Sequence, residues 1–204
     1  MSIEFPYKQI TVTVGAEFLG RFVVEKLKAH AGAEVFVPRC SEYNLGLAKK
    51  IMLVQSQSYR EQYGFNSIFL LPANLYGPGD HFDLESSHVI PALIRKCVTA
   101  RRSHAGFIDV WGSGKASREF LYVEDCAEGI VRSAQYYNKS DPVNLGNGRE
   151  VAIKDLVELI AKLTGFEGDV RWQTGRPDGQ PRRRLETSRA SELFGFTALT
   201  SLEQ

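Results

Sequence analysis

The stretch TVTVGAEFLG, residues 11–20, decides the fold. A β-rich run leads into a turn at Gly15, and an amphipathic helical pattern, EFLGRFVVEKLKAHAG, begins directly after it. A second apolar run of the buried-strand type, AEVFVP at residues 33–38, follows this helix. Because two strands joined through a helix usually pair in parallel, this opening predicts a β-α-β unit and an α/β protein.

Composition narrows the class of protein. The 204 residues are 43% hydrophobic and 24% charged, which is typical of a globular chain, and a net charge of +1 gives no reason to expect nucleic acid or a membrane surface as partner. The N-terminal residues lack a signal-peptide pattern. Cys40, Cys97 and Cys126 lie far apart without a CxxC pair, so we expect reduced thiols in a cytoplasmic protein.

The rest of the chain alternates helical and strand patterns. A long helical pattern with Leu47, Ile51 and Val54 at helical spacing covers residues 45–64, and a buried strand, NSIFLLP, follows it. The run FIDVWGSGKASREFLYV predicts a hairpin with a glycine turn, and Asp125 is expected to cap the helix after it. The pattern IKDLVELIAKLTG predicts an amphipathic helix that Gly165 ends.

The opening turn is an incomplete match to a dinucleotide-binding loop. The spacing GxxGxxG would put glycines at positions 14, 17 and 20, where the chain has Val14, Glu17 and Gly20. A Glu17 carboxylate about 4 Å from a pyrophosphate would cost about 4 kcal/mol at an effective dielectric near 20. An ordinary strand-to-helix turn is therefore an equal alternative. Arg39, at the end of the second strand, suits the extra phosphate of NADP or is a surface arginine.

Later runs carry a resemblance that spans nearly the whole chain. Residues 67–96, SIFLLPANLYGPGDHFDLESSHVIPALIRK, and residues 110–130, VWGSGKASREFLYVEDCAEGI, resemble the extended short-chain dehydrogenase/reductase superfamily. Within it they are most similar to the NADP-dependent epimerase/reductases of nucleotide sugars. Residues 143–166 and 176–196 extend the resemblance.

The resemblance implies reduction of a 4-keto sugar by hydride from NADPH. In the YxxxK pattern a tyrosine donates the proton and a lysine four residues later lowers its pKa. Lys49 matches the lysine, but Leu45 stands at the tyrosine position, and Tyr43 would lie on another face of the helix. His88 matches an acid/base histidine that contacts the cofactor. The alternatives are a solvated lysine and a capping or surface histidine.

The same resemblance implies the binding residues. Those for NADP are Gly15, Phe18, Leu19, Gly20, Arg39, Lys49, Pro72, Ala73, Asn74, Leu75 and His88. Those for a GDP-sugar are Lys96, Trp111, Arg118 and Asp178, with cations for the diphosphate and a carboxylate for hydroxyl groups. Residues 182–184, three arginines, are a solvated face or a second phosphate clamp. The loop DHFDLESSH has no metal-ligand spacing, so no metal is expected.

One part of the expected fold is missing. About three β-α units should separate the second strand from Lys49, and the chain allots only residues 40–48. We therefore expect a truncated Rossmann-like doubly wound parallel sheet with a small α+β substrate domain. Residues 1–75 would form the shortened NADP-binding domain without strands three to five. Residues 76–204 would form the nucleotide-sugar region, with residues 119–137 returning to the first domain.

The missing segment leaves alternatives open for both fold and function. Either the first strand pairs directly with the strand NSIFLLP, or two buried-type edges stay open. The chain is an active nucleotide-sugar epimerase/reductase, a non-catalytic nucleotide-sugar-binding module, or a shortened gene product that has no function of its own or acts only through association. We favour an epimerase/reductase whose activity is lost or severely impaired. Because proteins of this kind commonly dimerise through helices in this region, a homodimer is a further expectation.

Overall fold

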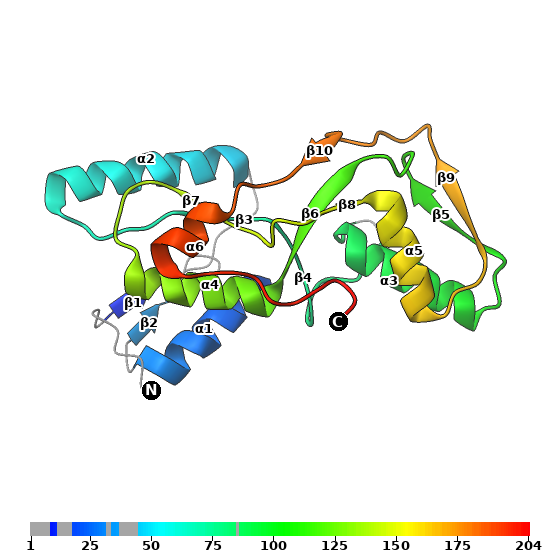
Figure 1. Cartoon of the computed structure of the whole chain (residues 1–204), viewed down its shortest axis with the longest axis horizontal. Helices are drawn as coiled ribbons and strands as arrows, with labels where there is room; N and C mark the ends of the chain where they lie inside the picture. Colours follow the sequence, from blue (N-terminus) through cyan, green and yellow to red (C-terminus); the bar gives the residue numbers. More distant parts are fainter. Residues whose placement is uncertain (1–8, 12–17, 32–33, 37–44, 85) are drawn as a thin grey trace.

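The computed structural model describes residues 9–11, 18–31, 34–36, 45–84 and 86–204 (Figure 1). Its helices are α1 (Phe18–Ala31), α2 (Leu45–Tyr63), α3 (Val89–Arg102), α4 (Val123–Tyr136), α5 (Ile153–Thr164) and α6 (Ser188–Phe194). Its strands are β1 (Gln9–Thr11), β2 (Glu34–Phe36), β3 (Leu70–Pro72), β4 (Asn74–Tyr76), β5 (Phe107–Trp111), β6 (Ser117–Tyr122), β7 (Val143–Leu145), β8 (Glu150–Ala152), β9 (Asp169–Gln173) and β10 (Arg182–Arg183).

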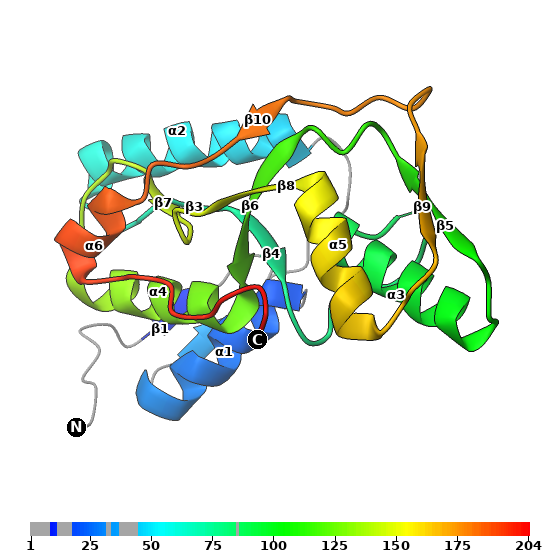
Figure 2. The ribbon, with the colours of Figure 1, turned by 45° about the vertical axis from the view of Figure 1, so that its right-hand side comes forward.

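Most strand pairs are parallel, as the β-α-β opening predicts. β1 pairs with β2, β3 with β7, β4 with β6, β10 with β6 and β5 with β9, all in parallel, while β8 joins β6 in an antiparallel pair. Figure 2 shows β4, β6 and β8 running between a group of helices around α4 and a second group formed by α3 and α5. The predicted α/β class is confirmed.

Two local predictions are corrected. β5 and β6 do not form the predicted hairpin, because β5 pairs with β9 and β6 pairs with β4, β8 and β10. Asp125 does not cap α4, which begins two residues earlier at Val123; its carboxylate instead accepts hydrogen bonds from the backbone N–H groups of Leu199 and Thr200. Of the two alternatives for the first strand, direct pairing with the strand NSIFLLP is not found within the described ranges, where β1 pairs with β2 and β3 pairs with β7.

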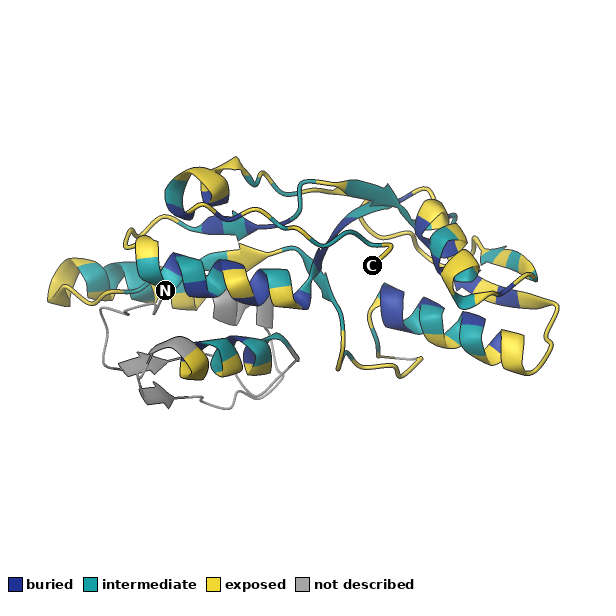
Figure 3. Cartoon of the chain, turned by 60° about the horizontal axis from the view of Figure 1, so that its bottom comes forward, coloured by how far each residue is buried: buried dark blue, intermediate teal, exposed yellow. Residues whose placement is uncertain are grey.

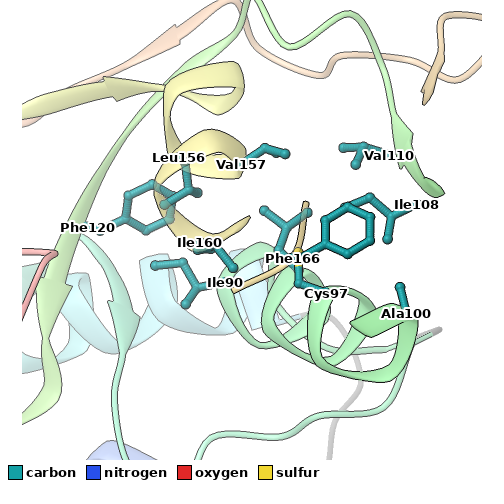
Figure 4. Close-up of a cluster of buried hydrophobic side chains, with 11 residues drawn as sticks. Ile90, Cys97, Ala100, Ile108, Val110, Phe120, Leu156, Val157, Ile160 and Phe166 are labelled. Atoms are coloured by element: carbon teal, nitrogen blue, oxygen red, sulfur yellow. The ribbon is translucent and has the colours of Figure 1, made fainter. Parts of the chain in front are cut away.

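The largest buried cluster lies between α3, α5 and the β5–β9 pair (Figure 4). It forms because α3 and α5 each bury the apolar stripe that their helical periodicity predicts, with Leu93 3% exposed and Leu156 1% exposed. α5 ends, as predicted, at Gly165, which has a left-handed φ of 68°. The members are Ile90, Leu93, Cys97, Ala100, Ile108, Val110, Phe120, Leu156, Val157, Ile160 and Phe166.

Two further clusters surround α4. α1 packs on α4 through Val23 and Leu27, which meet Ala127 and Val131. The other face of α4 packs against β7 and α6, where Leu145 and Phe194 are buried (Figure 3). The described part of the first β-α-β unit is therefore attached to the remainder of the chain through α4.

The apolar positions of α2 are mostly on the surface. Ile51 is 55% exposed and Val54 is 61% exposed, although their spacing predicts one face of a packed helix. The second half of α2 is held by polar contacts, since the Arg60 guanidinium donates to the carbonyl of Ser67 at 2.6 Å and to the Asn138 side chain at 2.7 Å. Among the residues that the structure describes, no helix is long and apolar enough to cross a membrane.

Candidate functional site

A pocket of about 160 Å³ lies where β4 and β6 meet the N-terminal end of α3. It brings together residues of three segments that lie far apart in the sequence: Asn74, Leu75, His88, Val89, Ile90, Arg118 and Phe120. Four of them are among the residues that the resemblance singled out. Asn74, Leu75 and His88 came from the predicted cofactor set, and Arg118 came from the predicted sugar-nucleotide set.

Backbone pairing positions the walls of the pocket. Asn74 stands opposite Phe120 in the parallel β4–β6 pair, and its amide donates to the carbonyl of Glu119 at 2.9 Å. The Glu119 side chain is 1% exposed and accepts hydrogen bonds from the N–H groups of Gly148 and Leu185, both at 2.8 Å. The buried carboxylate of Glu119, between the pocket residues Arg118 and Phe120 on β6, therefore ties this strand to two separate segments.

His88 is the residue before α3, and its side chain is 75% exposed. Its Nδ1 lies 3.7 Å from Oδ1 of Asp80, whose side chain is 5% exposed. The same Asp80 oxygen accepts the backbone N–H of His81 at 2.7 Å. In the loop considered above as a metal cluster, Asp83 accepts from Ser86, and the residues with described placement contain no group of three potential metal ligands.

Arg118 is a half-buried cation with three backbone acceptors. One guanidinium nitrogen donates to the carbonyls of Ser117 at 2.7 Å and of Gln180 at 2.6 Å, and the other donates to the carbonyl of Asp178 at 3.3 Å. Because neutral carbonyls fix its direction without cancelling its charge, the guanidinium stays available to an anion at the pocket.

Trp111 is 55% exposed at the end of β5 and is flanked by two cations. The Lys96 ammonium lies 5.8 Å and the Arg176 guanidinium 5.0 Å from its ring centroid. Burial lowers the pKa of Lys96, while the charge of Asp109 opposes that shift. The exposed Trp111 ring, with two positive charges close to it, suits a ligand in which a planar base or another π-system lies next to an anion.

Asp178 was predicted to hold sugar hydroxyls, and the structure places its carboxylate on Ser113. Oδ1 accepts the Ser113 backbone N–H at 2.6 Å, and Oδ2 accepts the Ser113 hydroxyl at 2.7 Å. These hydrogen bonds hold the pKa of Asp178 below its ordinary value.

Several predicted residues do not line the pocket. Leu19 packs into the two clusters beside α4, Gly20 is buried in α1, and the Ala73 N–H donates to the carbonyl of Leu145 at 2.8 Å. Pro72 is exposed at the end of β3. Gly15 and Arg39 lie outside the described residues, as do Val14, Glu17 and Tyr43. Phe18 and Lys49 belong to α1 and α2, but their side chains are not described.

The sequence analysis singled out neither Arg176 nor Glu119. Arg176 is the first residue of the resembling run 176–196 that contains Asp178, so its position was a usable signal, whereas nothing local marks Glu119 as buried. Arg182 is not free in solvent, because its guanidinium makes a two-point contact with Glu150, with Nη2 2.8 Å from Oε2. Arg183 and Arg184 are exposed.

The parallel α/β framework, with a pocket where β4 and β6 meet the start of α3 and a cation-flanked aromatic ring at the end of β5, is typical of α/β proteins that bind nucleotides. Residues 31–146 match the NAD dependent epimerase/dehydratase family. The chain belongs to this family, and the predicted family resemblance is confirmed.

Two of the curated relatives that the chain matches carry the name GDP-L-fucose synthase. The chain is 43% identical over 157 residues to a GDP-L-fucose synthase of Sinorhizobium fredii, covering 77% of this chain and 50% of that protein. It is 37% identical over 166 residues to a GDP-L-fucose synthase of Escherichia coli, covering 77% of this chain and 51% of that protein. The chain thus spans about half the length of the curated relatives that it matches.

Solved structures show the fold. A GDP-6-OMe-4-keto-L-xylo-heptose reductase from C. jejuni matches with a TM-score of 0.81 at 18% identity, covering 96% of this chain and 94% of that one. A GDP-L-fucose synthetase from Naegleria fowleri matches with a TM-score of 0.80 at 19% identity, covering 96% and 90%. The truncated Rossmann-like fold predicted from the sequence is confirmed.

Proposed function

We propose that the chain is a nucleotide-sugar epimerase/reductase of the GDP-L-fucose synthase type, which converts GDP-4-keto-6-deoxymannose to GDP-L-fucose, and that its reduction step is impaired. The observation that supports this most is the pocket, because His88 and Arg118 come to it from different segments. The curated relatives at 37–43% identity carry the same activity in their names.

The sugar-nucleotide side of the proposal rests on charge and shape. Arg118 offers a fixed guanidinium for a diphosphate, and Lys96 places an ammonium near the Trp111 ring. Trp111 offers an exposed aromatic face to the base or the sugar. We assign these residues, together with Asp178, to the GDP-sugar site.

The cofactor proposed is NADP, and the Naegleria fowleri protein was solved bound to NADP. The described residues fit a nicotinamide, because Leu75 and Phe120 give the pocket apolar walls beside the polar side chain of Asn74. When bound, NADPH supplies the hydride. We assign to its site Gly15, Phe18, Leu19, Gly20, Arg39, Lys49, Pro72, Ala73, Asn74, Leu75 and His88.

Impairment follows from proton supply and from the opening loop. The exposed imidazole of His88 can take or give a proton at the pocket, which suits epimerisation. Reduction also needs an acid at position 45, where Leu45 has no exchangeable proton. Glu17 adds a charge of the same sign as the cofactor's phosphates.

A non-catalytic GDP-sugar-binding module is the second candidate, and the intact surroundings of Arg118 favour it. Separate calorimetric titrations with GDP and NADPH, plus NADPH oxidation with the 4-keto sugar, distinguish the cases. We expect GDP to bind and NADPH to bind weakly or not at all. Turnover of the 4-keto sugar with tight NADPH binding would refute the impairment. If the protein bound neither GDP nor NADPH, only the hypothesis of a shortened gene product without a function of its own would remain. Arg118→Ala should abolish GDP binding, whereas Arg102→Ala, at the far end of α3, should not.

The loop itself can be tested by restoring its glycines. Val14→Gly combined with Glu17→Gly removes a β-branched side chain and a charge from the expected phosphate position. If the loop is the main defect, NADPH affinity should rise by up to about a thousandfold, which corresponds to the 4 kcal/mol estimated above. GDP affinity should stay unchanged, and an unchanged NADPH affinity would place the defect elsewhere.

The proposal also includes a cytoplasmic location and a division of the chain into an NADP-binding region, residues 1–75, and a nucleotide-sugar region, residues 76–204. It further includes a homodimer formed through α2. The exposed Ile51, Met52 and Val54 on α2 support self-association, because an apolar helix face gains stability by burial. Sedimentation of the wild type and of Val54→Asp tests it. A dimer that the variant converts to monomer supports the proposal, and a monomeric wild type refutes it.

A further inference from the structure

The loop between β4 and α3, residues 77–88, presents a buried carboxylate beside the imidazole of His88. The loop starts with a tight turn, in which the Asp80 N–H donates to the carbonyl of Gly77 at 3.3 Å. Gly79 has a left-handed φ of 86° and follows a proline, as in a type II turn. After this turn the Asp80 side chain is 5% exposed, and its Oδ1 lies 3.7 Å from Nδ1 of His88.

Contacts on both sides hold this loop against the two helices beside it. On the α1 side, the Arg21 guanidinium donates to the carbonyl of Pro78 at 3.2 Å. Gly79 leaves room for this guanidinium, since a Cβ there would lie 2.1 Å from it. On the α3 side, the Arg95 guanidinium donates to the carbonyl of Phe82 at 2.8 Å. The loop is therefore attached to both helices by contacts that do not involve its buried carboxylate.

The carboxylate of Asp80 can accept more hydrogen bonds than it receives. Its Oδ1 accepts the His81 N–H at 2.7 Å. Its Oδ2 is buried and has no hydrogen-bond partner among the residues that the structure describes. Because buried polar atoms in native proteins are nearly always hydrogen-bonded, this carboxylate needs a further donor. The imidazole of His88 is within reach of it.

The 3.7 Å between Oδ1 and Nδ1 is longer than a hydrogen bond, as is common for catalytic pairs without a bound ligand. The His88 side chain is 75% exposed, so rotation about its own bonds can close this gap while the buried carboxylate stays in place. A hydrogen bond from Nδ1 leaves Nε2 as the ring nitrogen that can exchange a proton with a ligand in the pocket.

We propose that Asp80 is a positioning residue for His88. Its carboxylate accepts the Nδ1–H of the imidazole and so selects the tautomer in which Nε2 carries the lone pair. Nε2 then exchanges a proton with a carbon next to the keto group of the sugar. The C–H bond breaks to leave an enolate and forms again when the proton returns from Nε2, and the carboxylate stabilises the imidazolium in between. The proton exchange rests on the proposed function, whereas the selection of the tautomer does not.

The first test is NMR of the ligand-free, full-length chain in mildly alkaline buffer. Long-range correlations between the ring protons and the ring nitrogens of His88 distinguish a protonated nitrogen from one that carries a lone pair. In the wild type, Nδ1 should carry the proton. In Asp80→Ala, which offers Nδ1 no acceptor, the proton should move to Nε2. The backbone amide signals of β4 and α3 in the same samples report whether the variant is folded.

The second test follows deuterium uptake from D₂O at the carbons next to the keto group of GDP-4-keto-6-deoxymannose. Asp80→Asn keeps an oxygen for the His81 N–H but replaces a charged acceptor by a neutral one. At saturating substrate its uptake rate should fall about tenfold while KM stays within about twofold, because a positioned acid–base group acts on the transition state. Asp83→Asn is the matched control in the same loop. Its rate should not change, because asparagine can still accept the Ser86 N–H.

A wild-type His88 that carries its proton on Nε2 would overturn the inference, and so would an unchanged tautomer in folded Asp80→Ala. Equal uptake rates in Asp80→Asn and Asp83→Asn would overturn it as well, as would a loss in Asp80→Asn that appears only in KM. If the wild type takes up no deuterium, the proposed epimerisation fails. The tautomers of the wild type and of Asp80→Ala then still decide whether the carboxylate positions the imidazole.

Discussion

Glu119→Gln should destabilise the protein by about 3 kcal/mol, although it changes only one atom of a side chain. Glu119 is 1% exposed, and each carboxylate oxygen accepts one backbone N–H, from Gly148 and from Leu185, at 2.8 Å. A glutamine must turn its amide N–H₂ toward one of these two donors. One hydrogen bond to a charged acceptor is then lost, worth about 1.5–3 kcal/mol, and a buried donor is left unpaired.

The surroundings leave little room for relaxation. A Cβ added at Gly146 would lie 2.1 Å from Oε1 of Glu119, which shows how closely the chain passes this carboxylate. The glutamine therefore cannot rotate away from the Gly148 and Leu185 donors without displacing backbone. Because Arg118 and Phe120 flank Glu119 on β6, we also expect a loss of GDP affinity in the same variant.

The assay is equilibrium unfolding in urea, followed by circular dichroism. With a slope of about 3 kcal/mol per molar urea for a chain of this size, the midpoint should fall by about 1 M. Glu167→Gln, on an exposed glutamate after α5, should shift the free energy of unfolding by less than about 0.5 kcal/mol. If Glu119→Gln unfolds at the same urea concentration as this control, the buried carboxylate does not hold the pocket together.

Three further predictions concern the same half of the chain. Phe120→Ala empties a site that is 2% exposed and should cost about 3–5 kcal/mol in urea unfolding; a loss below about 1 kcal/mol would contradict the packing. Hydrogen bonds from Arg182 hold the pKa of Glu150 below its ordinary 4.5, so its stabilisation is present above that pH and is lost as pH falls through the lowered pKa. Wild type and Glu150→Gln should accordingly differ in melting temperature at neutral pH and converge in acid. Burial raises the pKa of Cys97, and that of Cys126 to about 12, so peptide mapping after iodoacetamide treatment should find both unlabelled until urea is added.

Helices were predictable wherever one face had to be buried. The α5 pattern and its glycine stop gave bounds that agree with the structure, because helical periodicity and the left-handed C-terminal turn are local properties. Strand pairing is not local. β5 pairs with β9, some sixty residues later, and no feature near β5 identifies that partner. The glycines of the GSG run therefore looked like a hairpin turn.

Gly112 and Gly114 are glycines for a different physical reason. A Cβ at Gly112 would meet the Asp178 carboxylate at 2.3 Å, and one at Gly114 would meet the Trp172 ring at 2.7 Å. Both positions admit the close approach of segments that arrive from far along the chain. The candidate site was likewise predictable for residues that lie in the resembling runs, such as His88 and Arg118. Glu119 instead acts through Gly148 and Leu185, which only the fold brings near.

The two halves of the proposed activity depend on different parts of the chain. All buried members of the largest cluster lie between Ile90 and Phe166, so among the residues that the structure describes this cluster takes no buried side chain from the first 75 residues. The described part of the proposed cofactor-binding region instead depends on helix α1, which packs on the remainder of the chain through its contacts with α4. Changes in the opening loop should for this reason alter NADPH binding without altering GDP binding. On the proposed function, a chain without strands three to five would keep a folded sugar-nucleotide site while its reduction step would fail.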